Sequence, residues 1–126
     1  MGAVSRASAA GRLELGRAGE KAAADLLRRA GYEVVGSGFR ARRGELDLIC
    51  RRGPDLVVVE VKTRTDDAFG TPAAAVGSRK RRALQAAAAE YRVLAEWRGP
   101  IRYVVVGLTV SGKGTFEAEL IEDAFT

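Results

Sequence analysis

The stretch LVVVEVK, Leu56 to Lys62, predicts a buried strand that carries two charged side chains. Its four valines favour an interior strand covered on both faces, because β-branched residues pack well on a pleated surface. Side chains alternate along a strand, which gives one face with Val57, Val59 and Val61 and another with Leu56, Val58, Glu60 and Lys62. A buried charge persists only if it is paired, hydrogen-bonded or bound to a metal. Glu60 and Lys62 therefore need partners.

The preceding stretch GELDLICRR, from Gly44 to Arg52, predicts a second strand that pairs with the first. Between the two strands lies the segment RGPD, residues 52–55, which is a turn by composition. A hairpin centred between Gly53 and Pro54 places Asp47 directly opposite Glu60. Strict alternation gives one face with Leu46, Leu48 and Cys50 and another with Glu45, Asp47 and Ile49.

Two carboxylates at opposite positions of a hairpin need an explanation, because their Cβ atoms lie about 4.5 to 5.5 Å apart and like charges destabilise the pair. One interpretation is structural: both groups lie near a solvated sheet end, or one pairs with Lys62 or an arginine. Another is a divalent cation between them, since Mg²⁺ favours one or two carboxylates plus water and substrate phosphate. The register decides, because a slip of one residue sends Asp47 to the other face.

The composition predicts one compact domain. At 126 residues and 13.4 kDa the chain can bury roughly two thirds of its unfolded surface, and its hydrophobic content of 47% argues against disorder. We expect a flexible tail over residues 1–10 and a single domain over residues 11–126. The 21 basic and 16 acidic residues give a net charge of +5 and a pI of about 9.9, which suits an anionic partner.

The absence of histidine excludes several reaction classes. Histidine-based triads, HExxH metalloproteases and histidine general bases all need a residue that this chain lacks. The lone cysteine, Cys50, alternates in phase with Leu46 and Leu48, which indicates a buried thiol rather than a nucleophile. Hydrolysis here would have to use carboxylates, lysine and a metal.

No stretch approaches the roughly 18 apolar residues of a membrane span, and the N-terminus lacks the pattern of a secretion signal. We therefore predict a cytoplasmic protein without a membrane partner.

Two helices are predicted, each with a charged residue on its apolar side. The first runs from Gly11 to Ala30, and its apolar arc includes Glu20. Glu20 either needs a partner on the buried face or benefits from the macrodipole near an open helix end. The second runs from Arg79 to about Trp97 after Ser78 as its cap, with a predicted buried stripe of Leu84, Ala87, Ala88, Tyr91, Leu94 and Ala95.

The remaining segments are predicted from short local patterns. A first strand spans residues 32–42 and is bent by Gly36 or Gly38, a loop covers residues 63–76, and two further strands cover residues 101–109 and 115–121. The SGKG segment at residues 111–114 is a hairpin turn rather than a phosphate loop, because the spacing is wrong for a Walker motif.

Lysine is rare in this chain, with four residues against 17 arginines. Lys62 is a site candidate because lysine can give up its proton near a metal or another cation and offers a compact charge. Lys80 projects onto the apolar stripe of the second helix, where its stem can also simply cover apolar surface. The side chains expected to contact nucleic acid are Arg40, Arg42, Arg43, Arg64 and Lys80.

The element order α-β-β-β-α-β-β, with D-x(12)-E-x-K across the second and third strands, resembles the restriction-endonuclease-like fold of the PD-(D/E)xK nucleases and Holliday junction resolvases. From Gly16 onward the chain resembles the YraN family of uncharacterised bacterial proteins. The matching segments are GRAGE (residues 16–20), GELDLI (44–49), VEVKTR (59–64), FGTP (69–72), Val76 with Lys80, and EDAF (122–125). The chain departs from the family at Gly38, where relatives tend to carry asparagine, and at Val104, where they tend to carry aspartate.

The resemblance implies an α/β protein with a central mixed β-sheet of about five strands flanked by helices. It implies that Asp47 and Glu60 bind Mg²⁺ or Mn²⁺, that Lys62 orients or activates water, and that Glu20 supports the site. The expected function is a metal-dependent endonuclease acting on DNA, favoured over RNA, or on structured nucleic acid, with a homodimer needed to cut both strands. The alternative is a non-catalytic module that binds nucleic acid or protein.

Overall fold

The computed structural model describes residues 9–65, 76–110 and 115–122. The elements follow the predicted order, α-β-β-β-α-β-β, and comprise α1 (Ala9–Arg29), β1 (Glu33–Arg40), β2 (Glu45–Arg52), β3 (Asp55–Thr65), α2 (Ser78–Leu94), β4 (Ile101–Val110) and β5 (Phe116–Ile121). Residues 1–8 of the predicted tail, residues 66–75 of the loop predicted over residues 63–76 and the turn at residues 111–114 lie outside the described residues. Residues 9–10, predicted in the tail, begin α1, and residues 63–65, predicted in the loop, continue β3.

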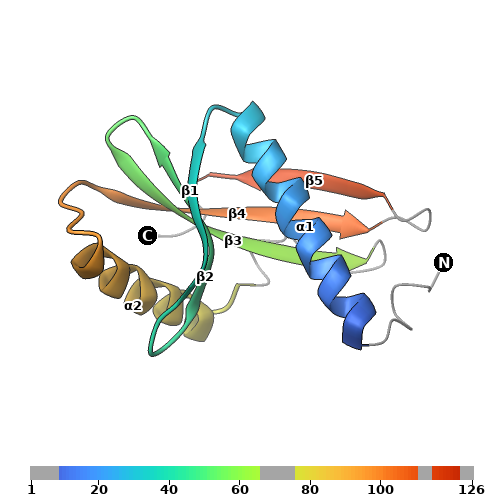
Figure 1. The fold of residues 1–126 in the computed structure, drawn as a ribbon, viewed down its shortest axis with the longest axis horizontal. Helices are drawn as coiled ribbons and strands as arrows, with labels where there is room; N and C mark the ends of the chain where they lie inside the picture. Colours follow the sequence, from blue (N-terminus) through green and yellow to red (C-terminus); the bar gives the residue numbers. More distant parts are fainter. Residues whose placement is uncertain (1–8, 66–75, 111–114, 123–126) are drawn as a thin grey trace.

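The five strands form one mixed sheet in the order β1-β2-β3-β4-β5. Every neighbouring pair is antiparallel except β3 with β4, which are parallel. Parallel strands need a long crossover connection, and α2 lies within it. The two helices cover opposite faces of the sheet (Figure 1), which confirms the predicted mixed α/β architecture.

The sheet separates two hydrophobic cores, and β3 contributes to both. Val57 and Val59 lie in the core beneath α1, whereas Leu56 and Val58 lie in the core beneath α2. All four side chains are at most 2% exposed, and full burial of such a side chain stabilises the fold by about 1.5–3 kcal/mol. The alternation predicted for the central strand is therefore confirmed.

The alternation predicted for β2 is wrong at one residue. Leu48 and Cys50 pack in the α1 core as a pair, but Leu46 packs in the α2 core. Across the ladder, Ser37 pairs with Leu48 and Phe39 with Leu46, and Gly38 between them has φ +64. A left-handed residue breaks the regular pleat, and glycine adopts this conformation without a steric penalty.

Both ends of α2 differ from the prediction. Ser78 is the first helical residue rather than the cap, because Gly77 holds the N-cap position and makes no side-chain bond. The helix ends at Leu94, and Glu96 follows with φ +52. Leu94 is 72% exposed and Ala95 is exposed, so neither belongs to the buried stripe. Leu94 instead lines a surface cavity together with Val93 and with Arg42 and Arg43 of the β1–β2 turn.

Two other predictions concern single features. Cys50 is fully buried, and burial raises the pKa of its thiol to about 11, so it behaves as an apolar core residue. Among the described helices, neither is long and apolar enough to cross a membrane.

Candidate metal and nucleic-acid site

The candidate site lies where β2 and β3 diverge. Their ladder runs from the Arg52–Asp55 pair to the Leu48–Val59 pair, which is the predicted register and brings Asp47 next to Glu60. Beyond Val59, β3 continues to Thr65 in a ladder with β4, while β2 turns away toward β1 (Figure 1).

At this fork the Asp47 side chain accepts a hydrogen bond from the β3 backbone, as a strand carbonyl would in a regular ladder. The Val61 backbone N–H donates a hydrogen bond to Oδ2 of the Asp47 carboxylate at 2.9 Å. This contact satisfies an amide of β3 just past the last paired residues of β2. It also fixes the orientation of the carboxylate, which is the requirement for a residue that positions a ligand.

Glu60 is the one buried charged side chain among the described residues, at 6% exposed. Its Oε2 lies 3.4 Å from Nζ of Lys80, whereas its Oε1 has no hydrogen-bond partner in the described part of the chain. Burial, followed by the charge of the Asp47 carboxylate and a hydrogen bond that protonated Glu60 makes with it, raises the pKa of Glu60 to about 7 against the opposing effect of Lys80; the unpartnered Oε1 is thus that of the ionised carboxylate. A buried, incompletely satisfied carboxylate beside a second one is typical of a functional site.

The two candidate lysines lie differently. Lys80 is in the first turn of α2, and its half-exposed side chain reaches Glu60. Lys62 is half-buried on β3, two residues after Glu60 and thus on the same face. The sequence predicted Lys62 as the amine beside Asp47 and Glu60. The ammonium group that forms an ion pair with Glu60 is that of Lys80.

Glu20 is exposed, which matches the interpretation of a helix end open to water rather than that of a partner on a buried face. It lines a cavity of about 300 Å³ between α1 and the first strands, together with Ser37 and Leu48. Partial burial, followed by the charges of Asp47 and Glu45, raises the pKa of Glu20. Glu20 is thus within electrostatic range of Asp47 without being enclosed.

Glu45 is the acidic residue that sequence reasoning missed. Its charge acts on Glu20, so four carboxylates gather around the fork: Glu20, Glu45, Asp47 and Glu60. The predicted alternation of β2 could not have located it, because that alternation fails at the neighbouring Leu46.

The donor set fits a hard divalent cation with few protein ligands. Within residues 9–65, 76–110 and 115–122, no three His, Cys, Asp or Glu side chains form a group that could hold a metal ion. A zinc site with three or four protein ligands is therefore a poor match. Asp47 and Glu60, with the partnerless Oε1, match the one or two carboxylates that Mg²⁺ uses together with water and phosphate oxygens.

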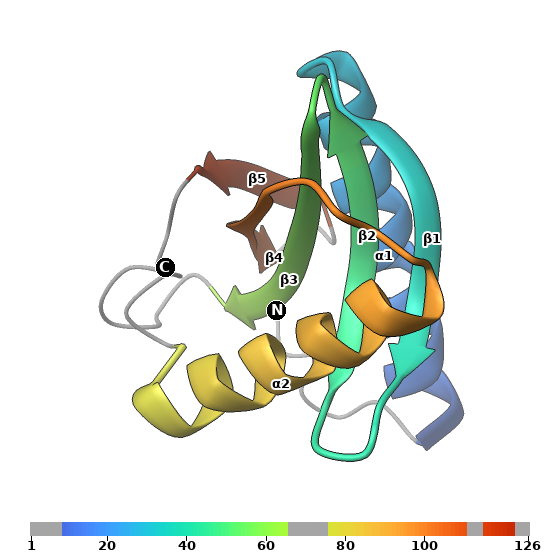
Figure 2. The ribbon, with the colours of Figure 1, turned by 90° about the vertical axis from the view of Figure 1, so that its left-hand side faces the viewer.

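The basic residues predicted to bind nucleic acid are spread over two segments. Arg40, Arg42 and Arg43 are exposed at the turn between β1 and β2, and Arg64 is half-buried near the end of β3. Figure 2 shows that turn and the end of β3 on the side of the molecule away from the β2–β3 turn. Lys80, the fifth residue of this set, forms an ion pair with Glu60.

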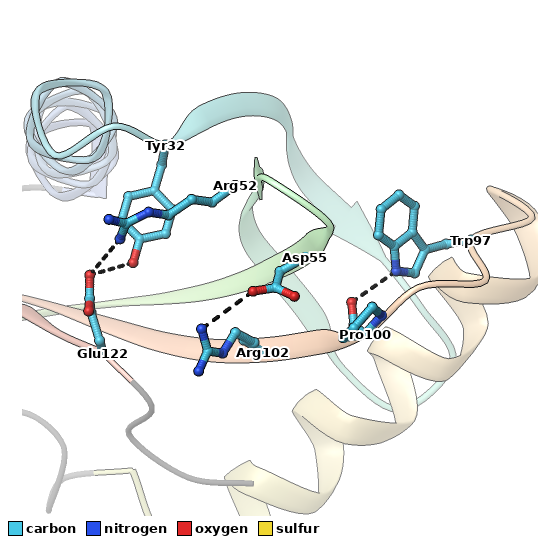
Figure 3. A network of polar contacts seen from close by, with 7 residues as sticks. All are labelled: Tyr32, Arg52, Asp55, Trp97, Pro100, Arg102 and Glu122. Carbon is cyan, nitrogen blue, oxygen red and sulfur yellow. Dashed lines mark hydrogen bonds and ion pairs between the residues drawn. The ribbon is translucent and has the colours of Figure 1, made fainter.

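A second polar cluster lies at the β2–β3 turn and was not predicted. The Tyr32 hydroxyl donates to Oε1 of Glu122 at 2.6 Å, and Arg52 donates to the same oxygen at 3.0 Å (Figure 3). Arg102 contacts Asp55 at 3.4 Å beside them. The hydrogen bond from Tyr32 is the main cause that lowers the pKa of Glu122. The sequence marked Glu122 only as the first residue of the EDAF segment.

Comparison with known proteins gives a consistent assignment. Residues 19–108 match the family described as "Uncharacterised protein family UPF0102". A UPF0102 protein from Symbiobacterium thermophilum is 41% identical over 112 residues, covering 88% of this chain and 95% of the relative. A UPF0102 protein from Thermodesulfovibrio yellowstonii is 36% identical over 114 residues, covering 90% and 97%.

A UPF0102 protein from Rhodococcus opacus is 40% identical over 114 residues, with coverage of 90% and 97%. The family match spans the fork of β2 and β3, the C-terminal half of α1 and the whole of α2. UPF0102 is the YraN family that the sequence motifs resemble, and the chain belongs to it.

Proposed function

We propose that this protein is a metal-dependent nuclease that hydrolyses phosphodiester bonds in DNA or structured nucleic acid, on a restriction-endonuclease-like fold. The observation that carries the proposal is Glu60: a buried carboxylate with a partnerless oxygen, next to Asp47, at the fork of β2 and β3. A structural carboxylate would be expected to have its hydrogen bonds satisfied. This one is arranged as a cation ligand.

Each residue of the site has a distinct role. Asp47 and Glu60 would hold Mg²⁺ or Mn²⁺, with Asp47 oriented by the Val61 N–H. The bound ion would supply charge to the phosphate and lower the pKa of water. Lys62 would stabilise the negative charge that develops on the phosphate oxygens as water adds to phosphorus and the ester oxygen leaves. Glu20 would support the site by adding negative charge near Asp47.

The charge of the chain supports an anionic substrate. The net charge is +5 even though four carboxylates gather at the fork. Exposed Arg40, Arg42 and Arg43, with Arg64, would bind the phosphate backbone on either side of the acidic residues. DNA is favoured over RNA as the substrate.

The test is cleavage of branched, single-stranded and duplex DNA and of RNA in Mn²⁺ by the purified protein. We expect cleavage of at least one of these substrates, and its loss in Asp47→Ala and Glu60→Ala. Asp55→Ala is the matched control, because Asp55 is a carboxylate of the same hairpin that pairs with Arg102 instead. Cleavage that persists in both site variants would overturn the proposal.

A second candidate is a binding module without catalysis, and one observation favours it: no group of three metal-ligating side chains occurs among the described residues. It predicts nucleic-acid binding that weakens with roughly the 0.9 power of salt for each phosphate contact. Under this alternative no metal yields cleavage.

A homodimer is the form in which so small a chain would cut both strands of a duplex. Trp97 and Tyr103 pack against the α2 core. Val93 and Leu94 are the most exposed large apolar side chains of the described chain, at 74% and 72%. Sedimentation velocity of wild type against Leu94→Glu tests this face.

A further inference from the structure

The ion pair between Lys80 and Glu60 joins a fixed group to a movable one. Glu60 is 6% exposed on the central strand β3, which is paired on one side with β4 along its whole length. Lys80 is in the first turn of α2 and its side chain is 45% exposed. The 3.4 Å contact can therefore be broken by rotation of the lysine into solvent, while the carboxylate stays in place.

The charges of Asp47 and Glu60 indicate the role of the Lys80 ammonium group. Asp47 and Glu60 repel each other, and Lys80 is the cation that lies on Glu60. A divalent ion held by Asp47 and Glu60 would carry twice that charge, and the ammonium lies 3.4 Å from Oε2 of Glu60. Like charges at about 4 Å repel strongly in a partly buried site, so the ion and the ammonium compete for Glu60.

We propose that Lys80 is a displaceable counter-ion of the acidic site. It neutralises the Glu60 carboxylate when no metal is bound. Metal binding releases Lys80, which then contacts the nucleic-acid backbone. This inference rests on the proposed function and adds a residue to it. The exchange couples binding of the metal ion to binding of the nucleic acid, because the metal ion frees the Lys80 ammonium, which then contacts a phosphate. Coupling between two ligands is reciprocal, so nucleic acid must also tighten metal binding.

The experiment measures Mn²⁺ affinity by calorimetry and by the electron paramagnetic resonance signal of free Mn²⁺. Lys80→Met removes the charge and keeps the apolar stem. We expect it to bind Mn²⁺ about tenfold more tightly than wild type, within the 5- to 150-fold range typical of coupled sites. Lys80→Gln, which keeps a polar end, should behave alike. Arg79→Met is the matched control, because it removes an exposed cation from the same helical turn.

A second measurement tests the release step. Binding of duplex and branched DNA is measured in the presence of Ca²⁺. Ca²⁺ binds carboxylates and is used in place of Mn²⁺ so that binding is measured without cleavage. We expect added Ca²⁺ to tighten DNA binding to wild type and to give a several-fold smaller gain in Lys80→Met. Circular dichroism establishes that each variant is folded.

The outcomes separate this inference from the nuclease proposal. If wild type and Lys80→Met bind Mn²⁺ with the same affinity, the role of Lys80 is overturned and the metal site stays intact. The same holds if Arg79→Met gains as much Mn²⁺ affinity as Lys80→Met. Binding that is measurable only in Lys80→Met supports the competition strongly. No binding in either protein overturns both proposals.

Discussion

Two glutamates lie in opposite electrostatic surroundings: Glu122 follows β5 and contacts Arg52 at the β2–β3 turn, whereas Glu60 lies midway along β3. Glu122 is exposed, and Tyr32 and Arg52 donate to one of its oxygens at 2.6 and 3.0 Å, so the pKa of its carboxyl is lowered. Glu60 is buried, its nearest cation is 3.4 Å away, one oxygen has no partner in the described chain, and its pKa is raised to about 7. The first arrangement stabilises the fold, whereas the second leaves a carboxylate in need of a cation.

The largest expected difference between the two clusters is in catalysis and metal binding. Asp47→Ala should reduce cleavage by on the order of 10²–10³-fold, the size seen when one group that stabilises transition-state charge is lost, and should abolish Mn²⁺ binding. Glu122→Ala should change neither, because it lies in the cluster at the β2–β3 turn (Figure 3). Rates from a fluorescent DNA substrate and Mn²⁺ calorimetry would check both variants. Equal losses in the two variants would show that Glu122 contributes to cleavage and metal binding as much as Asp47 does.

The second difference concerns stability against pH. Folded Glu60 keeps its proton to about pH 7, whereas an ordinary glutamate releases it near 4.5. The folded state therefore holds more protons in this window, and the free energy of unfolding falls as pH rises through it, by up to about 3 kcal/mol. Glu60→Gln stays neutral and should lack this loss. Urea unfolding at pH 4.5 and 7.5 compares the variant with wild type, and parallel profiles would contradict the expectation.

Glu122 should show the opposite sign. Its pKa is lowered in the folded state, so its contribution is present above the ordinary value of 4.5 and is lost as pH falls below it. Tyr32→Phe removes the hydrogen bond from the hydroxyl and should cost about 1 kcal/mol at neutral pH. The cost should shrink in acid. A constant cost between pH 3 and 7 would mean that packing of the ring, and not the bond to Glu122, is responsible.

The smallest effect is expected at Asp55, which pairs with the exposed Arg102 at 3.4 Å. Asp55→Asn should lower the free energy of unfolding by less than about 1 kcal/mol, since partly exposed ion pairs contribute little. The effect should decrease further in 1 M salt, because salt screens such pairs. Thermal denaturation at low and high salt measures it. A loss as large as that of Tyr32→Phe would show that Asp55 belongs to the same tight cluster as Glu122.

Several differences between prediction and structure share one cause. Glu20 lies in the apolar arc of α1 by periodicity but is exposed, and Leu94 fits the stripe of α2 but is 72% exposed. Periodicity shows which side chains share a helix face. It does not show how far along the helix that face remains covered by the sheet, and this depends on where the helix lies.

By itself, the sequence determined the order of elements, the two faces of β3 and the meeting of Asp47 with Glu60. These follow from the two-residue period of a strand and from a tight turn that sets the hairpin register, and both depend on residues near in sequence. Only the tertiary structure decided that Lys80 pairs with Glu60, 20 residues away, and that Tyr32 donates to Glu122, 90 residues away. Such contacts depend on how packed elements lie against one another, and no local period encodes that.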